Sequence, residues 1–434
     1  MTKYSTHNFT DEIRNRLSIV DVVSKYVPLE KRGRAYWCCC PFHNEKTASM
    51  CINEQRNCYH CFGCNEHGDI FAFVMKFLHV DFLEAAKILA EMASVEVPKK
   101  RSIQSKEKQE RYAEYIDVYT RATTEYANKL YEPVGKKALE YLYQRGFTDE
   151  IIKKYNIGYA PDACILCKTL GKARIPSAIR AGLVRDNGNG CYDFFKNRIM
   201  FPITNESGDI VAFSGRSFDG TMPKYMNTVD TEFFHKKQTL FGLSMAKNDI
   251  YKRNRTIVVE GQIDCIKMQC SGYAETVAPL GSALTKEHVA TICKMNRNIM
   301  FLFDGDDAGK KAAYKAGKET APFIRFDSDV RVALLPLGED PDSLLQQKGK
   351  KSIDEVLKSS IPLFEYIWSY MLGLWNTREI LGRANFLHGL SEFVSLLEDT
   401  ELRGIIRTEF VAKTLKRFYS KTDRIALTKR LENG

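Results

Sequence analysis

Two close pairs of metal-ligating side chains constrain the N-terminal part of this sequence more than any other feature. The first pair is Cys40-Pro-Phe-His43 and the second is Cys61-Phe-Gly-Cys64. In each pair, two intervening residues form a tight turn that directs both ligands towards one point. Two such pairs can complete a tetrahedron around zinc. The spacing therefore predicts a zinc ribbon with one structural Zn²⁺ bound by Cys40, His43, Cys61 and Cys64.

Other side chains of the same segment compete for this assignment. Cys38 and Cys39 precede His43 by five and four positions, which makes a poorer turn. The further competitors are Cys51, Cys58, His60 and His67. A cluster of reduced cysteines packed as small hydrophobic residues is the alternative to a metal site. The Pro and Gly turns and the shortness of the segment argue against that alternative.

Aromatic and basic residues near these pairs have two interpretations. Tyr59, Phe62 and Lys46 can stack on single-stranded nucleic acid and neutralise its phosphates. Alternatively, the aromatic rings shield the zinc site. Both interpretations stay open at the level of the sequence.

A second C-x2-C motif lies at Cys164-Ile-Leu-Cys167. It has no partner pair nearby in the sequence and no adjacent Gly-Pro context of the redox type. We therefore interpret it as having no metal or redox function.

Length and composition indicate a globular protein of several domains. The chain has 434 residues, of which 44% are hydrophobic and 27% charged, enough for two to four domains with apolar cores. It has no run of about 18 apolar residues, and residues 1–7 lack the apolar core of a signal peptide. We therefore expect a cytoplasmic protein without membrane contact, whose 13 cysteines are reduced. A net charge of +10 favours a polyanionic partner such as nucleic acid, and it is also compatible with a merely soluble surface.

The pattern of elements predicts a multidomain α+β protein. Buried-type strands at 256–260, 276–278, 298–303 and 330–335 alternate with helices, which predicts a mostly parallel, doubly wound, Rossmann-like sheet. Residues 8–30 read as a short amphipathic helix, and the sequence from about 350 reads as a helical bundle. The predicted domains are a zinc-binding domain (1–98), a linker (99–111), the first part of a mixed α/β core (112–245), the catalytic sheet (246–345) and a helical subdomain (346–434).

Carboxylates follow three of the predicted parallel strands. Glu260 and Asp264 follow the first strand, Asp304 and Asp306 the third, and Asp340 and Asp342 the fourth. The carboxyl ends of parallel strands meet at one edge of a sheet, where these acids would repel one another without cations. Hard oxygen ligands suit Mg²⁺ or Mn²⁺, and two such ions can activate a 3′-hydroxyl and stabilise a leaving pyrophosphate. Each cluster alone also fits an ordinary turn.

Longer motifs follow one another in a fixed order and carry a resemblance to a known family. They are Cys40–Thr47, Tyr59–Cys64, Arg198–Ile203, Gly215-Arg216, Pro223–Asn227, Phe234–Lys236, Leu240–Leu243, Glu260-x3-Asp264, Leu280–Thr285, Asp304-x-Asp306 and Asp340-Pro-Asp342. On these motifs the chain resembles bacterial DnaG-type primases over nearly all of its length. Glu260-x3-Asp264 with Asp304-x-Asp306 resembles the TOPRIM signature, which topoisomerases and some nucleases share.

The resemblance implies a DNA-directed RNA polymerase that makes short RNA primers from ribonucleoside triphosphates on single-stranded DNA. It implies Glu260, Asp304 and Asp306 as catalytic residues, Glu260 as a general acid/base or metal-linked carboxylate. It also implies Asp264, Asp304, Asp306, Asp340 and Asp342 as a cluster for two or more Mg²⁺ or Mn²⁺ ions. Template and nucleotide contacts are implied for Arg145, Arg198, Arg216, Lys224, Asn227 and Lys236. The implied partners are a replicative helicase of the DnaB type and, as a further candidate, a single-stranded DNA-binding protein.

The sequence departs from the family pattern at two points. Family members commonly have a basic residue where Phe194 stands, which affects one template contact. The family also usually carries a further C-terminal domain that docks on the helicase, whereas this sequence stops after its helical region. Two other classes compete with a primase: a TOPRIM nuclease or topoisomerase-like enzyme, and a zinc-ribbon protein that binds DNA without catalysis. Nucleotide incorporation distinguishes a primase from both.

Overall fold

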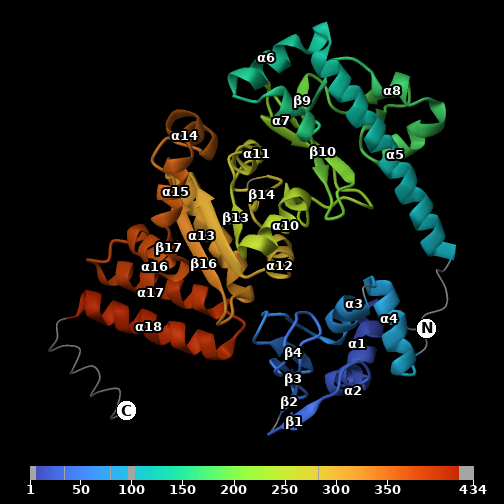
Figure 1. Ribbon diagram of the computed structural model, residues 1–434. Coiled ribbons are helices and arrows are strands. Elements are labelled where there is room, and N and C mark those ends of the chain that lie inside the picture. Colours follow the sequence, from blue (N-terminus) through green and yellow to red (C-terminus); the bar gives the residue numbers. More distant parts are fainter. Residues whose placement is uncertain (1–5, 34, 79, 96–102, 282, 420–434) are drawn as a thin grey trace. The chain divides into compact units, whose positions relative to one another are not determined.

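The chain divides into two compact units. The computed structural model describes residues 6–33, 35–78, 80–95, 103–281 and 283–419 (Figure 1). The N-terminal unit is Met1–Glu107 and the core unit is Lys108–Gly434. Residues 96–98 at the end of the predicted zinc-binding domain, residues 99–102 of the predicted linker, and Ser282 lie outside the described residues. None of the helices in the described ranges is long and apolar enough to span a bilayer.

The N-terminal unit is an antiparallel sheet covered by four helices. The strands pair in the order β1-β2-β3-β4-β5. They are β1 (Glu30–Arg32), β2 (Ala35–Cys38), β3 (Met50–Asn53), β4 (Cys58–Cys61) and β5 (His67–Gly68). The helices are α1 (Thr6–Arg16), α2 (Ile19–Ser24), α3 (Ile70–Leu78) and α4 (Phe82–Met92). The predicted helix at 8–30 is two helices, because Ser18 ends the first run and caps α2 by accepting a hydrogen bond from the Asp21 N–H.

The long helix α5 (Ile103–Tyr131) begins in the last residues of the N-terminal unit, and its larger part, from Lys108, belongs to the core unit. This helix begins inside the segment 99–111 that the sequence analysis assigned to a linker. The reason is that the polar residues of 103–111 are mostly Lys, Glu, Gln and Arg, which favour helix even where few apolar residues mark a buried face. A charged run was therefore not evidence against a helix here.

An antiparallel sheet packs beside α5. Its strand order is β11-β10-β9-β6, and β7 and β8 form a separate hairpin. The strands are β6 (Gly158–Ala160), β7 (Val184–Asp186), β8 (Cys191–Asp193), β9 (Arg198–Thr204), β10 (Ile210–Arg216) and β11 (Tyr225–Asn227). The helices are η1 (Pro133–Gly135), α6 (Lys136–Gln144), α7 (Asp149–Lys154), α8 (Leu166–Thr169), η2 (Lys172–Arg174) and α9 (Ile175–Arg180).

The second sheet of the core unit has the predicted topology. Its order is β12-β14-β13-β15-β16-β17, with four parallel strands flanked by antiparallel edge strands. The strands are β12 (Leu240–Phe241), β13 (Thr256–Val258), β14 (Thr276–Pro279), β15 (Asn298–Phe303), β16 (Asp329–Leu334) and β17 (Ile361–Pro362). Alternate strand residues enter two different hydrophobic clusters, so both faces of this sheet are covered.

Helices cover the two faces of this sheet unequally. One face carries α11 (Gln262–Cys270), α14 (Pro341–Lys348) and α15 (Lys350–Lys358). The other carries α10 (Leu243–Arg253), α12 (Lys286–Cys293), α13 (Asp307–Thr320), η3 (Ala321–Phe323) and α16 (Leu363–Leu374). The chain ends in α17 (Ile380–Ser395) and α18 (Thr400–Phe418), which join the same cluster as α16 (Figure 1). The predicted subdivisions at 245/246 and 345/346 stay predictions, and α10 and α14 run through these positions.

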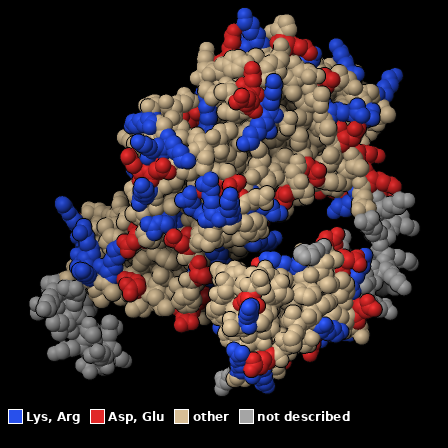
Figure 2. Space-filling view, viewed as in Figure 1, with Lys and Arg blue, Asp and Glu red and all other residues tan. Residues whose placement is uncertain are grey.

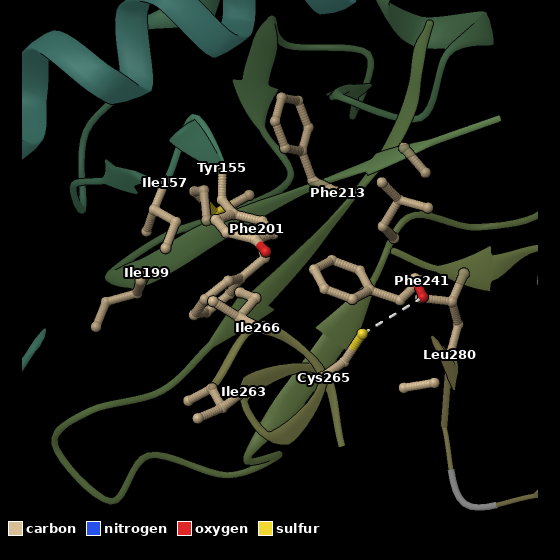
Figure 3. Packing of buried hydrophobic residues seen from close by; sticks show 14 of the residues in the cluster. Tyr155, Ile157, Ile199, Phe201, Phe213, Phe241, Ile263, Cys265, Ile266 and Leu280 are labelled. Atoms are coloured by element: carbon tan, nitrogen blue, oxygen red, sulfur yellow. Dashed lines mark hydrogen bonds between the residues drawn. The ribbon is translucent and has the colours of Figure 1, made fainter. Parts of the chain in front are cut away.

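One hydrophobic cluster joins the two sheets of the core unit. Phe201 and Phe213 of the antiparallel sheet lie in the same buried cluster as Ile263 and Cys265 of α11 (Figure 3). The Cys265 thiol donates to the Phe241 carbonyl oxygen at 3.8 Å. Close packing of this kind resists relative movement. It therefore fixes the carboxylates that follow the parallel strands relative to the basic residues of the other sheet.

Candidate functional sites

The fold brings the four predicted zinc ligands together. Cys40 follows β2, His43 lies in the next loop, Cys61 ends β4, and Cys64 lies in the turn before β5. Their ligand atoms all lie within 4.8 Å of one another. The Cys40 and Cys64 Sγ atoms are 3.8 Å apart, and Cys61 Sγ is 3.8 Å from His43 Nδ1. Three sulfurs and one imidazole at this spacing form a tetrahedral donor set suited to zinc.

Surrounding groups prepare these side chains to bind a cation. Burial raises the pKa of the Cys61 thiol, but hydrogen bonds from Ser49 and the backbone N–H groups of Cys64 and Gly63 outweigh it and lower that pKa to about 7. Glu45 Oε2 lies 3.1 Å from His43 Nε2, which leaves Nδ1 facing the sulfurs. Glu45 was not singled out from the sequence. A carboxylate two positions after the histidine was the available signal.

The competing ligand candidates have other surroundings. Cys38, Cys39, Cys51 and Cys58 do not join the ligand group in the described part of the chain. His60 Nε2 lies 3.0 Å from Asn65 Oδ1, and His67 Nδ1 lies 3.0 Å from the Asn65 carbonyl oxygen. These contacts occupy the imidazoles outside the cluster.

The aromatic residues beside the ligands divide between the two open interpretations. Tyr59 is 1% exposed and packs against Phe42 and Phe73, so the prediction that it stacks on nucleic acid is wrong. Its aromatic character marked a core position. Phe62 is 69% exposed and stacks on Trp37 with the ring centroids 5.9 Å apart. An exposed, pre-stacked pair of this kind is suited to receive a base.

The acidic residues meet at the carboxyl edge of the parallel sheet, as the topology predicts. Glu260 Oε1 accepts a hydrogen bond from the Asp304 backbone N–H at 3.2 Å, which ties the ends of β13 and β15 together. Asp306 and Asp340 cap α13 and α14 by accepting from the N–H groups three residues later. No three of these carboxylates have oxygen atoms within 4.8 Å of one another among the described residues. The edge gathers them without closing them into a tight ligand shell.

Burial and mutual repulsion disfavour the ionised forms of the carboxylates at this edge. Burial raises the pKa of Asp304 to about 7, and the charges of Glu260, Asp340 and Asp306 add to the rise. Burial also raises the pKa of Asp264 to about 7, assisted by Asp340, Asp304 and Asp342 and opposed by Arg145. The pKa of Glu260 is raised too, chiefly by burial. The carboxylates of this edge therefore lack enough neighbouring positive charge, and a bound cation would stabilise their ionised forms.

Asp342 differs from the other acids because protein side chains already contact both of its carboxylate oxygens. It is 2% exposed, and its Oδ2 lies 2.8 Å from Arg145 Nη2. Its Oδ1 accepts from Gln346 Nε2 at 2.7 Å and lies 3.5 Å from Lys267 Nζ. Asp342 thus anchors Arg145 at the mouth of the site. The sequence offered no sign of this pairing.

A cavity of about 570 Å³ joins the acidic edge to a basic wall. Its acidic lining is Glu260, Asp264, Asp304 and Asp340, and its other polar lining residues include Arg145, Arg216, Lys224 and Asn227. Asn227 donates to the Leu280 carbonyl oxygen at 3.4 Å, while its Oδ1 has no hydrogen-bond partner in the described part of the chain. Asp306 and Asp342 do not line the cavity.

Two tyrosines hold Arg216 in this wall. Its Nε and Nη2 donate to the Tyr141 hydroxyl at 3.1 and 2.8 Å, and its Nη1 donates to the Tyr225 hydroxyl. The guanidinium also lies over both rings, 5.7 and 5.0 Å from their centroids. An arginine fixed in this way can present its charge to a phosphate with little loss of rotamer entropy.

The remaining predicted basic contacts lie at different depths. Arg198 is 5% exposed and donates to the Pro223 carbonyl oxygen at 2.8 Å, so it supports the backbone next to Lys224 instead of facing the cavity. Lys236 is exposed, and a Cβ on Gly281 would lie 2.8 Å from its Nζ, so glycine permits this approach. Phe194 carries the Arg185 guanidinium 4.9 Å from its ring centroid, which places a positive charge near the position where the family is commonly basic.

Surface charge alone does not locate a polyanion site. In Figure 2, Lys and Arg side chains are interspersed with Asp and Glu over the visible face of the core unit. Several blue side chains gather near the middle of this face, but red ones adjoin them. The net charge of +10 is therefore spread, and the cavity wall is the more specific indication.

Three family models match consecutive parts of the chain. The CHC2 zinc finger matches residues 5–105, the N-terminal domain of the DNA primase catalytic core matches 125–247, and the Toprim domain matches 254–333. The DNA primase of Escherichia coli K12 is 33% identical over 406 residues, covering 92% of this chain and 70% of that protein. The DNA primase of Staphylococcus epidermidis is 39% identical over 345 residues, covering 78% of this chain and 57% of that protein.

Solved structures give the same picture over both units. The zinc-binding and RNA polymerase domains of the Aquifex aeolicus primase match with a TM-score of 0.61 and 29% identity, covering 93% of this chain and 96% of that one. A DnaG primase catalytic domain bound to single-stranded DNA matches with a TM-score of 0.63 and 30% identity, covering 70% and 99%. A DNA primase domain from Pseudomonas aeruginosa gives 0.65 and 32%, covering 69% and 96%.

Proposed function

Because this chain belongs to the bacterial DNA primases, DNA-directed RNA polymerases that synthesise RNA primers, we propose that nucleotidyl transfer takes place in the cavity between its acidic edge and basic wall. One observation carries this assignment: the same cavity is lined by Asp304, Glu260, Arg216 and Lys224. Acids that attract cations and bases that attract phosphates then face one another across the space of a nucleotide.

The acidic edge fits divalent cations. Glu260, Asp304 and Asp340 offer carboxylate oxygens to the cavity, and burial together with mutual repulsion raises the pKa of Asp304 to about 7. Hard oxygen donors with unneutralised charge suit Mg²⁺ or Mn²⁺. When bound, such ions activate the attacking 3′-hydroxyl and offset charge on the leaving pyrophosphate. Asp264 completes the lining, while Asp306 and Asp342 act from outside it.

Glu260 is the proposed acid–base residue. The Asp304 N–H holds its Oε1 at 3.2 Å, which fixes the carboxylate in one orientation. Its pKa is raised chiefly by burial, which brings a carboxylate closer to the range in which it can accept a proton. Its role is to take the proton of the attacking hydroxyl at a carboxylate oxygen.

The basic wall binds phosphates of the nucleotide and of the template. Arg216 is presented by Tyr141 and Tyr225, and Lys224 follows the carbonyl that Arg198 supports. Asn227 offers an unpartnered carbonyl oxygen to a ribose or base donor. Lys236 and Arg145 extend the positive charge on either side, Arg145 being shared with Asp342.

The proposed partners are single-stranded DNA and ribonucleoside triphosphates. A related catalytic domain, 30% identical to this chain, has been solved bound to single-stranded DNA. In the N-terminal unit, Cys40, His43, Cys61 and Cys64 are the proposed zinc ligands, and exposed Phe62 with Lys46 is a proposed contact to the template. A DnaB-type helicase and a single-stranded DNA-binding protein remain proposals that rest on the family.

Primer synthesis on random single-stranded DNA tests this proposal. Labelled ribonucleotides with Mg²⁺ or Mn²⁺ should give short RNA products from the unmodified chain. Asp304→Ala should lower the yield by at least about 100-fold. The matched control is Glu409→Gln on α18, where an exposed carboxylate is removed far from the site in sequence. Equal yields from all three proteins would overturn the assignment of the acidic edge.

A further inference from the structure

A second group of metal-ligating side chains lies in the core unit. Spacing along the chain indicates no metal function for Cys164 and Cys167, because no partner pair lies nearby, whereas the fold brings Asp193 to them. Cys164 and Cys167 flank the start of the short helix α8, and Asp193 ends strand β8. The two Sγ atoms and one Asp193 oxygen lie within 4.8 Å of one another, the same limit that the Cys40, His43, Cys61 and Cys64 group meets. Only these two groups meet that limit among the described residues.

Cys191 does not itself meet the 4.8 Å limit, but it lies two positions before Asp193 on the same strand and is the candidate for a fourth ligand. Residues two positions apart on a strand point to the same face, so the Cys191 side chain leaves β8 on the side of Asp193. The Cys164 thiol lies 4.0 Å from the Cys191 carbonyl oxygen.

The carboxylate of Asp193 is held in place for a further ligand. It is 1% exposed and accepts from the N–H groups of Ile165, Leu166 and Cys167 at 2.7, 2.9 and 3.1 Å. A carboxylate offers about four lone-pair positions, so these bonds leave room for one more partner. No Lys or Arg ion pair to Asp193 is found in the described part of the chain. The buried charge therefore has backbone donors but no counter-cation.

We propose that Cys164, Cys167, Cys191 and Asp193 form a second Zn²⁺ site, distinct from the zinc ribbon. Cys164 and Cys167 have the two-residue spacing of a zinc knuckle, and the hairpin β7–β8 supplies the other two ligands. The ion would join α8 to the β7–β8 hairpin and would stabilise the packing of these two elements against each other. This site takes no part in nucleotidyl transfer, because none of its residues lines the catalytic cavity.

Zinc content is the first test. The full chain, loaded with Zn²⁺ under reducing conditions and dialysed into metal-free buffer, should hold about two Zn²⁺ ions by mass spectrometry of the elements. A Cys164→Ser, Cys167→Ser double variant should hold about one, and a Cys61→Ser, Cys64→Ser variant should also hold about one. A Cys270→Ser variant, which removes an exposed thiol elsewhere, should keep both. About one ion in the unmodified chain, retained in the Cys164, Cys167 variant, would overturn the proposal.

Cobalt substitution tests the ligand set through its absorption spectrum. Co²⁺ bound by thiolates gives an intense charge-transfer absorption that weakens as thiolates are removed. Cys191→Ser should weaken the band that remains in the Cys61→Ser, Cys64→Ser background. Asp193→Asn keeps a carbonyl oxygen for the backbone N–H groups yet should lower the affinity for Zn²⁺ by about ten-fold or more. A band that Cys191→Ser leaves unchanged in that background, or Zn²⁺ affinity that Asp193→Asn leaves unchanged, would refute the site.

Discussion

Asp304→Asn should abolish primer synthesis and at the same time stabilise the metal-free protein at high pH. The carboxyl of Asp304 has an ordinary pKa of 3.8 and a pKa of about 7 in the folded protein, because it is buried beside Glu260, Asp340 and Asp306. A group whose pKa rises on folding binds more protons in the folded state. Its contribution to stability is therefore fully present at low pH and is lost as pH rises from about 4 to about 7.

The size of the effect follows from the same values. A rise from 3.8 to about 7 corresponds to at most about 4 kcal/mol of destabilisation at pH 8. The neighbouring carboxylates remain in the variant and the effective dielectric at the cavity is high, so we expect about 1–2 kcal/mol to be recovered. For a unit as large as Lys108–Gly434, with an unfolding entropy of about 0.7 kcal/mol/K, that gain raises Tm by about 1–3 °C.

Calorimetric melting from pH 4 to pH 8 without added divalent cations measures the difference. The gain should be largest at pH 8 and vanish near pH 4, and the control Glu409→Gln should show no such slope. Added Mg²⁺ should raise the Tm of the unmodified protein more than that of Asp304→Asn, since only the former keeps the full acidic edge. A variant that melts at or below the unmodified protein at pH 8, or a difference independent of pH, would refute this account of the acidic edge.

Three further changes test other parts of the structure. Gly63→Ala places a Cβ 2.7 Å from His43 Nε2, so zinc affinity in a chelator competition should fall by about 10-fold to 100-fold, and unchanged affinity would contradict the ligand geometry. Tyr141→Phe removes two hydrogen bonds to Arg216 and should raise the KM for ribonucleotides about ten-fold with a smaller change in kcat. Glu275→Gln removes a fully buried carboxylate that pairs with two arginines, and should lower the free energy of unfolding by about 3 kcal/mol in denaturant titrations. A loss below about 1 kcal/mol would show that the ion pairs of Glu275 with the two arginines contribute little to the stability of the fold.

Much of the fold and family could be predicted because the signals are local. The alternation of buried strands and helices predicts the mostly parallel sheet, which the structure and its relatives confirm. The ordered motifs predict a DNA primase, which the family models and the curated relatives also confirm. The first prediction rests on residue spacing, which backbone geometry sets along one element, and the second on the resemblance of the motifs to a known family.

Local sequence patterns were insufficient where side-chain burial or helix propensity decided the structure. Tyr59 was a candidate for base stacking, yet it is a core residue, because its strand turns that side inwards. Residues 103–111 of the predicted linker begin α5, because polar helix formers need no apolar stripe to extend a helix. The division between the two compact units, at Glu107/Lys108, falls within the predicted linker 99–111, whose bounds stay a prediction.

The sequence by itself predicted the ligand pairs of the zinc ribbon, the mostly parallel sheet and the edge at which the acids gather. In each case a short stretch of chain or the rule that parallel strands end together is sufficient. Only the tertiary structure decided which acids stay free: Asp342 is taken by Arg145, while Asp304 is left facing its like-charged neighbours. Likewise, Tyr141 reaches Arg216 across 75 residues, and Asp193 reaches Ile165 beside the Cys164 and Cys167 pair across 28. Such partners are chosen by the packing of distant elements around a shared core, and no spacing along the chain encodes that packing.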